Sequence, residues 1–103
     1  MGIFDTFSKG PSLEDIQAYL DKGAVVLDVR TIEEFEEGHA KGSKNIVLDT
    51  IPDYIDEIKA FDAPIVAVCR SGNRSGSATS FLKNHGLDVI NGGPWNVVAP
   101  LVE

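Results

Sequence analysis

The sequence predicts an α/β fold with a small, mostly parallel β-sheet that is covered by helices on both faces. Short, continuously apolar runs of the kind that form buried strands alternate with segments whose apolar residues recur at helical spacing. The chain has 103 residues, of which 43% are hydrophobic and 24% charged, as in ordinary globular domains. We find no internal repeat, linker or low-complexity stretch, so we expect residues 1–103 to form a single domain.

Two capping boxes mark helix starts in the first half of the chain. Ser12 and Asp15 have the spacing of the first box, and Thr31 and Glu34 have the spacing of the second. A glycine that suits a helix end follows each capping box, Gly23 after the first and Gly38 after the second. The expected elements are a short strand near residues 6–8, a helix from Ser12 to Gly23 with Leu13, Ile16 and Leu20 on its apolar face, a buried strand over 24–29, a helix over 32–37 that ends at Gly38, and a short strand over 46–48.

Helix and strand signals also alternate in the second half. Pro52 suits the first turn of a helix, and Gly86 suits a helix end. The expected elements are a helix with the apolar stripe Ile51, Ile55 and Ile58, a buried strand over 64–68, a helix over 74–84 that buries Ala78, Phe81 and Leu82, a strand over 87–90 and one helical turn within 95–101.

The charge of the chain limits its partners. Nine basic and 16 acidic residues give a formal net charge of −7, which repels phosphate backbones, so we expect no nucleic acid partner. No apolar run approaches the ~20 residues of a membrane helix, and no export leader is present. We therefore expect a cytoplasmic domain. Residues 1–6 fit the N-myristoylation pattern, but a frayed or capping N-terminus is the favoured interpretation.

The only cysteine, Cys69, stands at the carboxyl end of a predicted strand and just before a predicted helix. Ligand sites of open α/β sheets lie at such ends. Backbone N–H groups of the turn, the helix dipole and the guanidinium groups of Arg70 and Arg74 all favour a negative charge, which should lower the thiol pKa. We expect Cys69 to be a nucleophilic thiolate, the alternative being a buried structural thiol. The two arginines should form a local positive island that attracts an anionic small molecule.

A lone cysteine excludes an internal disulfide. Together with two well separated histidines, His39 and His85, it gives no recognisable zinc spacing. We expect neither a metal nor a cofactor.

Three segments of the chain resemble the single-domain rhodaneses. They are residues 26–30 with Glu33–Phe35 and Gly38–His39, residues 42–46, and Cys69–Ser75 with Gly92, Gly93 and Trp95 downstream. Their order and spacing over roughly residues 12–97 make the match specific. One departure is Ala40–Lys41, where the family usually has Ile-Pro. We expect this change to alter the local loop and not the chemistry.

The resemblance implies a rhodanese-like fold and a sulfurtransferase that works through a Cys69 persulfide. Cys69 would take the outer sulfur of a small anionic donor such as thiosulfate, or of a protein persulfide, and pass it to a thiophilic acceptor (cyanide, a thiol or a protein). The loop that binds substrate and persulfide would consist of Arg70, Ser71, Gly72, Asn73, Arg74 and Ser75, with the Ser75 hydroxyl also available to cap the helix.

Three polar residues outside this loop are interpreted as structural support. Asp28 and Arg30 are expected to form a charge network at a strand end that positions the neighbouring loops. The resemblance places His39 in a structural turn.

Two other functions are weighed against the sulfurtransferase. Four residues separate Cys69 from Arg74. Phosphatases with a cysteine nucleophile, including the rhodanese-like ones, have five residues between the corresponding cysteine and arginine, so a phosphatase or arsenate reductase is disfavoured. A sulfur carrier or interaction module without useful turnover, which docks partners through acidic helices, remains the main alternative. The C-terminal helix looks short, so part of the sheet is open to a possible homodimer.

Overall fold

A four-stranded parallel sheet forms the centre of the protein. The computed structural model describes residues 10–103, so the strand expected near residues 6–8 and the myristoylation pattern lie outside the described part. The strands are β1 (Val25–Asp28), β2 (Lys44–Asn45), β3 (Ile65–Cys69) and β4 (Val89–Pro94), in the spatial order β2-β1-β3-β4. The predicted α/β class with a parallel sheet is confirmed.

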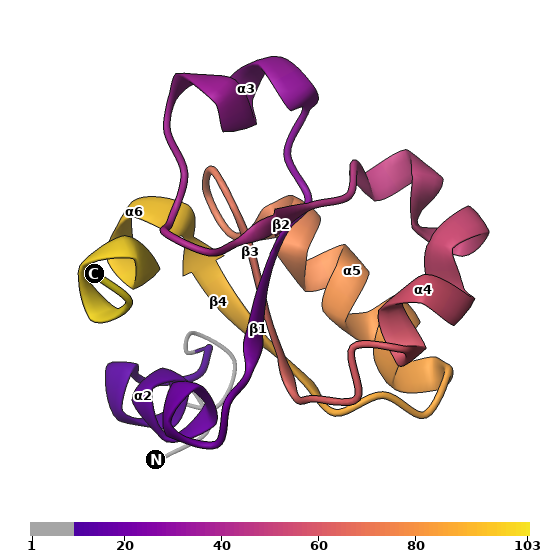
Figure 1. The fold of residues 1–103 in the computed structure, drawn as a ribbon, viewed down its shortest axis with the longest axis horizontal. Helices are drawn as coiled ribbons and strands as arrows, with labels where there is room; N and C mark the ends of the chain where they lie inside the picture. The colour runs from indigo at the N-terminus through magenta and orange to yellow at the C-terminus, as the bar shows by residue number, and fades with distance from the viewer. Residues whose placement is uncertain (1–9) are drawn as a thin grey trace, which may run out of the picture.

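Helical segments connect the strands and cover both faces of the sheet (Figure 1). The α-helices are α2 (Leu13–Asp21), α3 (Ile32–Glu37), α4 (Ile55–Lys59), α5 (Asn73–Asn84) and α6 (Trp95–Val98), and the 3₁₀ helices are η1 (Leu48–Tyr54) and η2 (Ala99–Leu101). Both predicted capping boxes are present, at Ser12 of α2 and at Thr31 of α3. Figure 1 shows α3 beyond the carboxyl ends of the strands, at the same end as the loop that joins β3 to α5.

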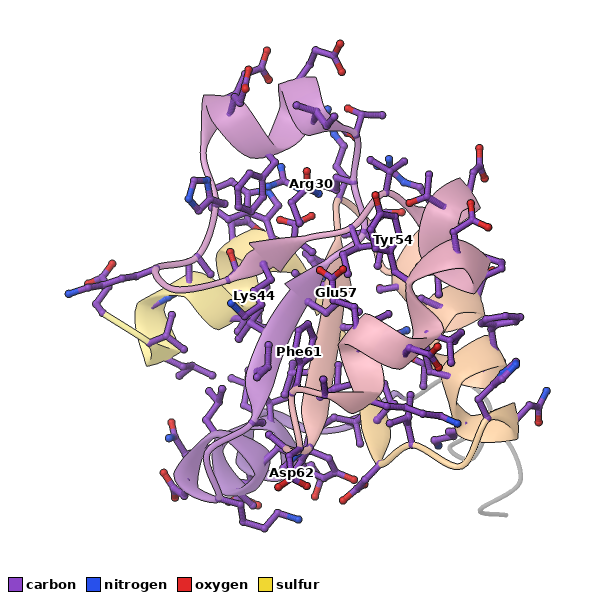
Figure 2. All side chains as sticks on the ribbon, turned by 45° about the vertical axis from the view of Figure 1, so that its right-hand side comes forward. Arg30, Lys44, Tyr54, Glu57, Phe61 and Asp62 are labelled. Carbon is purple, nitrogen blue, oxygen red and sulfur yellow. The ribbon has the colours of Figure 1, made fainter. Side chains whose placement is uncertain are left out.

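The second strand differs from the prediction. It comprises Lys44–Asn45 and not residues 46–48, because β1 ends at Asp28 and gives an edge strand regular partners only at Leu27 and Asp28. The chain then turns into η1 from Leu48. At this edge the Lys44 ammonium lies 5.8 Å from the centroid of the Phe61 ring (Figure 2).

The helix expected around Pro52 is divided into two pieces. Pro52 lies inside the 3₁₀ helix η1, and regular α-helix begins only at Ile55, because proline has no N–H to donate within an α-helix. Ile51 and Ile58 are nevertheless fully buried and Ile55 is half-buried, so the predicted apolar stripe is confirmed.

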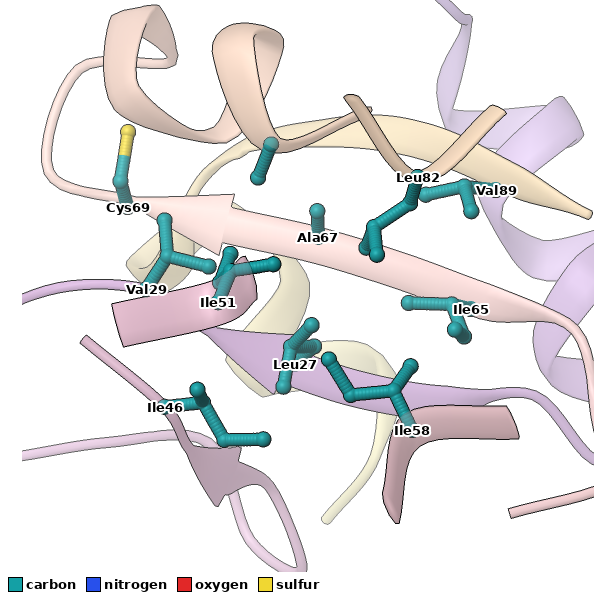
Figure 3. Packing of buried hydrophobic residues seen from close by; sticks show 11 residues of the cluster. Leu27, Val29, Ile46, Ile51, Ile58, Ile65, Ala67, Cys69, Leu82 and Val89 are labelled. Carbon is teal, nitrogen blue, oxygen red and sulfur yellow. The ribbon is translucent and has the colours of Figure 1, made fainter. Parts of the chain in front are cut away.

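Side chains from alternate positions of the strands fill two separate cores. One core lies on the side covered by η1, α4 and α5 and contains Leu27, Ile65, Ala67 and Cys69 (Figure 3). The other core lies on the side covered by α2, α6 and η2 and contains Val26, Val66 and Val68. Two apolar residues were placed wrongly, since Leu13 is 56% exposed and Phe81 is only half-buried. Leu13 is the first residue of α2 and Phe81 lies at the edge of the core against which it packs.

The last strand is longer than predicted and begins later. Leu87 belongs to the turn that follows α5, because its N–H donates to the Leu82 carbonyl oxygen at 3.1 Å. The strand starts at Val89 and contains a β-bulge at Gly92, since Ala67 pairs with Asn91 and Val68 pairs with Gly93.

Glycine is required at position 92 because the bulge leaves no space there for a side chain. A Cβ at Gly92 would lie 2.6 Å from Val66 Cγ1 and 3.2 Å from the Ala67 carbonyl oxygen. We therefore expect Gly92→Ala to destabilise the protein by about 1–3 kcal/mol through overpacking. Urea unfolding measures this change. Gly10→Ala is the control, since a Cβ there meets no atom within 4 Å, and an equal unfolding midpoint for both variants would contradict the prediction.

Candidate active site

The sulfur of Cys69 lies beneath the loop that joins β3 to α5. Cys69 is the last residue of β3 and has no exposed surface. The Gly72 N–H donates to Sγ at 3.0 Å and the Ser75 N–H at 3.3 Å, and Ser75 Oγ lies 3.2 Å from Sγ. The backbone and hydroxyl groups of one short turn therefore converge on a single sulfur atom.

These hydrogen bonds decide the ionisation of the thiol. Burial raises the pKa of Cys69, but hydrogen bonds from the Ser75 hydroxyl and from the N–H groups of Ser75, Gly72 and Ser71 outweigh it, so the pKa lies below that of an ordinary thiol. A lower pKa favours the thiolate form of Cys69, which reduces the need for a separate general base. No guanidinium group makes a hydrogen bond to the sulfur within residues 10–103, but the charge of Arg74 interacts with that of Cys69.

Asn91 of β4 holds the loop in this conformation. Its amide nitrogen donates to the Gly72 carbonyl oxygen at 3.0 Å. Its amide oxygen accepts from the Ser75 hydroxyl at 2.6 Å and from the Gly93 N–H at 2.9 Å. Gly72 itself has a φ of 104°, a left-handed conformation that favours glycine. Asn91 therefore fixes the two residues, Gly72 and Ser75, that donate to the sulfur.

Sequence reasoning missed Asn91. The only local signal was an asparagine before the pair Gly92–Gly93 at a predicted strand end. The bulge directs the Asn91 side chain toward α5, and Gly76 leaves space for it, since a Cβ there would lie 3.3 Å from Asn91 Nδ2.

Ser75 has a different local role from the one expected. It is the third residue of α5, and the N-cap position belongs to Gly72, which has no side-chain cap. The fully buried Ser75 hydroxyl contacts Asn91 and Cys69 instead. The hydroxyl has a single proton, which it donates either to the Asn91 amide oxygen or to the sulfur of an ionised Cys69.

Glu34 of α3 offsets part of the positive charge of the two arginines in the loop. Arg74 makes a bidentate ion pair with Glu34 of α3, at 2.7 and 3.1 Å, and Arg70 is 78% exposed with Nη1 3.9 Å from the same carboxylate. The Arg74 hydrogen bond and the Thr31 N–H lower the pKa of Glu34 to about 2. The sequence analysis treated Glu34 only as a capping residue and did not foresee this ion pair, which reduces the positive charge expected for the loop.

Asp28 and Arg30 form a buried ion pair at the end of β1. Arg30 Nη2 donates to Asp28 Oδ2 at 2.7 Å and to the Gly38 carbonyl oxygen at 2.7 Å. The Arg30 guanidinium also lies 4.7 Å from the centroid of the Trp95 ring. Figure 2 shows Arg30 between α3 and the sheet. The pair therefore connects β1, the end of α3 and α6.

His39 follows α3 and lies outside the loop. Its ring stacks on Phe35 with 3.7 Å between centroids, and Nδ1–H donates to the Phe35 carbonyl oxygen at 2.7 Å. These contacts place His39 within the turn after α3, and no contact joins it to Cys69.

Two hollows flank the loop. A cleft of about 260 Å³ on the α3 side is lined by Arg30, Glu34, Glu37, Gly38, Arg70 and Trp95. A groove of about 350 Å³ on the other side borders Ser71–Asn73 and Gly92–Pro94. Over residues 10–103, no group of three or more His, Cys, Asp or Glu side chains is arranged to hold a metal ion, and no helix is long and apolar enough to cross a membrane.

The hydrogen bond from Ser75 can be tested directly. We expect Ser75→Ala to raise the pKa of Cys69 and to slow its alkylation by iodoacetamide roughly tenfold or more at pH values below the wild-type titration midpoint. A hydrogen bond to a charged group contributes about 1.5–3 kcal/mol, and the alanine variant loses it. Ser80→Ala is the control on the exposed side of α5. Identical pH profiles for the wild type and the Ser75 variant would contradict this assignment.

Comparison with known proteins identifies similar chains. The family model described as Rhodanese-like domain matches residues 12–94. The thiosulfate sulfurtransferase GlpE of Pseudomonas aeruginosa is 36% identical over 101 residues, which cover 93% of this chain and 90% of that protein. GlpE of Pseudomonas syringae is 40% identical over 77 residues, 75% of this chain and 72% of that protein.

A solved structure shares the fold. The reduced CoADR-RHD of Bacillus anthracis superposes with a TM-score of 0.74 and 30% identity, covering 98% of this chain and 18% of that longer chain.

Proposed function

The chain belongs to the rhodanese-like domain family, and from this we propose that it is a sulfurtransferase that carries sulfane sulfur on Cys69 as a persulfide. The relatives named thiosulfate sulfurtransferase support the reaction class. The observation that carries the proposal is the convergence of the Gly72 and Ser75 donors on Cys69 Sγ.

The first half-reaction forms the persulfide. The Cys69 thiolate attacks the outer sulfur of thiosulfate, the sulfur–sulfur bond of the donor breaks, and sulfite leaves with its electron pair: Cys69–S⁻ + S₂O₃²⁻ → Cys69–S–S⁻ + SO₃²⁻. The lowered pKa of Cys69 increases the fraction of the thiol that is present as the nucleophilic thiolate. No proton is transferred, so no general base is needed.

The second half-reaction returns the enzyme to its starting state. A nucleophilic acceptor attacks the outer sulfur, and the Cys69 thiolate is the leaving group: Cys69–S–S⁻ + CN⁻ → Cys69–S⁻ + SCN⁻. The N–H groups of Gly72 and Ser75 stabilise the thiolate as it departs, because they already point at its position.

The loop geometry favours sulfur chemistry over phosphoryl transfer. The Gly72 N–H lies 3.0 Å from the sulfur itself, and Arg74 is engaged by Glu34. A phosphatase needs its loop amides and arginine to surround the three oxygens of a phosphoryl group above the sulfur. These donors are committed elsewhere, which supports the sulfurtransferase and disfavours the phosphatase.

The decisive assay is thiocyanate formation from thiosulfate and cyanide. We expect turnover by the wild type, together with a mass increase of one sulfur atom on the protein after incubation with thiosulfate alone. Cys69→Ser should abolish both because serine cannot form a persulfide.

Unfolding of both proteins by urea checks that the variant is folded. Retained turnover in folded Cys69→Ser would exclude the persulfide mechanism. Release of phosphate from an aryl phosphate, lost in the same variant, would favour the phosphatase instead.

A further inference from the structure

The Glu34 carboxylate forms ion pairs with the guanidinium groups of the loop. Its two carboxylate oxygens accept from both terminal nitrogens of Arg74, and one of them lies 3.9 Å from Arg70. The Glu34 side chain is 21% exposed and that of Arg74 35%. This ion pair therefore lies near the protein surface, and Glu34 lines the cleft beside the loop together with Arg70.

The remaining charges of the cleft do not restore a positive site. Arg30 is neutralised by the buried Asp28. Glu37 lines the same cleft as Arg70, and α3 carries no basic residue. Arg70 makes only a long ion pair with Glu34, at 3.9 Å, and its side chain is 78% exposed.

Protonation does not release Glu34. Because Arg74 and Thr31 lower its pKa to about 2, the carboxylate stays charged at every pH at which the protein would normally be assayed. A donor can form an ion pair with Arg74 only by competing with Glu34, which carries its negative charge at both pH 5 and pH 9.

Two classes of sulfur donor differ in what they need from this site. Thiosulfate brings two negative charges to an already negative nucleophile. An organic persulfide brings one, and transfers its outer sulfur in a balanced exchange: Cys69–S⁻ + R–S–S⁻ → Cys69–S–S⁻ + R–S⁻. A fixed carboxylate beside the loop repels the dianion about twice as strongly as the monoanion.

We infer that Glu34 is a specificity-determining residue that shifts the donor preference of this site away from thiosulfate and toward singly charged persulfides. The inference rests on the proposed sulfurtransferase function and adds the class of donor. Its physical basis is the position of one carboxylate on the two arginines of the sulfur-binding loop.

Glu34→Gln removes the negative charge, together with the acceptor of the hydrogen bond from Arg74 Nη2. The glutamine amide oxygen can still accept the Thr31 N–H, so the capping box of α3 is retained while the negative charge is removed. Glu36→Gln is the matched control, with the same substitution on the same helix at an exposed residue that makes no ion pair with Arg70 or Arg74.

The experiment measures the rate constant for persulfide formation on Cys69 by mass spectrometry, separately with thiosulfate and with hydroxyethyl persulfide. We expect Glu34→Gln to raise the thiosulfate rate constant relative to the persulfide rate constant by roughly tenfold. Glu36→Gln should leave this ratio near that of the wild type at about 0.15 M salt, where exposed charges are screened beyond about 8 Å. Urea unfolding confirms that both variants are folded.

Each outcome separates the two proposals. An unchanged or lowered ratio in folded Glu34→Gln overturns the role of Glu34 and leaves the sulfurtransferase intact, provided that the wild type forms the persulfide. A wild type that forms no persulfide with either donor overturns the proposed function itself. A rise in the ratio for Glu36→Gln as large as for Glu34→Gln also overturns the inference, because the effect would then follow net charge and not the ion pair.

Discussion

Hydrogen bonds that converge on the Cys69 sulfur are the constraint on which the rest of the site depends. For the Gly72 N–H to reach the sulfur, Gly72 must adopt a positive φ, and for the Ser75 N–H to do so, α5 must begin immediately after it. Asn91 holds both residues from the neighbouring strand. Asn91 in turn depends on the bulge at Gly92. A thiolate buried without these donors would be strongly disfavoured, because burial alone raises a thiol pKa.

Two ion pairs place α3 against this loop. The buried pair of Asp28 and Arg30 reaches the end of α3 through the Gly38 carbonyl oxygen, and the pair of Glu34 and Arg74 joins the start of α3 to α5. Such pairs contribute modest net stability, since desolvation offsets much of their attraction, but they specify geometry. They also determine electrostatics, because Asp28 and Glu34 offset the charges of Arg30 and Arg74 beside the loop.

The predictions succeeded where the signal was local. Both capping boxes, the buried strand before Cys69 and the apolar stripe of Ile51 and Ile58 follow from neighbouring residues alone, and all are present. The failures share another cause. The bounds of β2 depend on where β1 ends, and the bulge of β4 depends on Val66 in β3, so neither can be determined within one segment.

The sequence by itself determined the fold class, the family and the position of the single cysteine at a strand end, because hydrophobic periodicity, capping patterns and motif spacing are properties of neighbouring residues. Only the tertiary structure decided which groups surround that cysteine. Glu34 lies 40 positions from Arg74, and Asn91 lies 16 positions from Ser75. Their contacts arise from the packing of α3 and β4 around the loop. The charge that a donor meets is therefore a result of folding, which composition and local pattern do not contain.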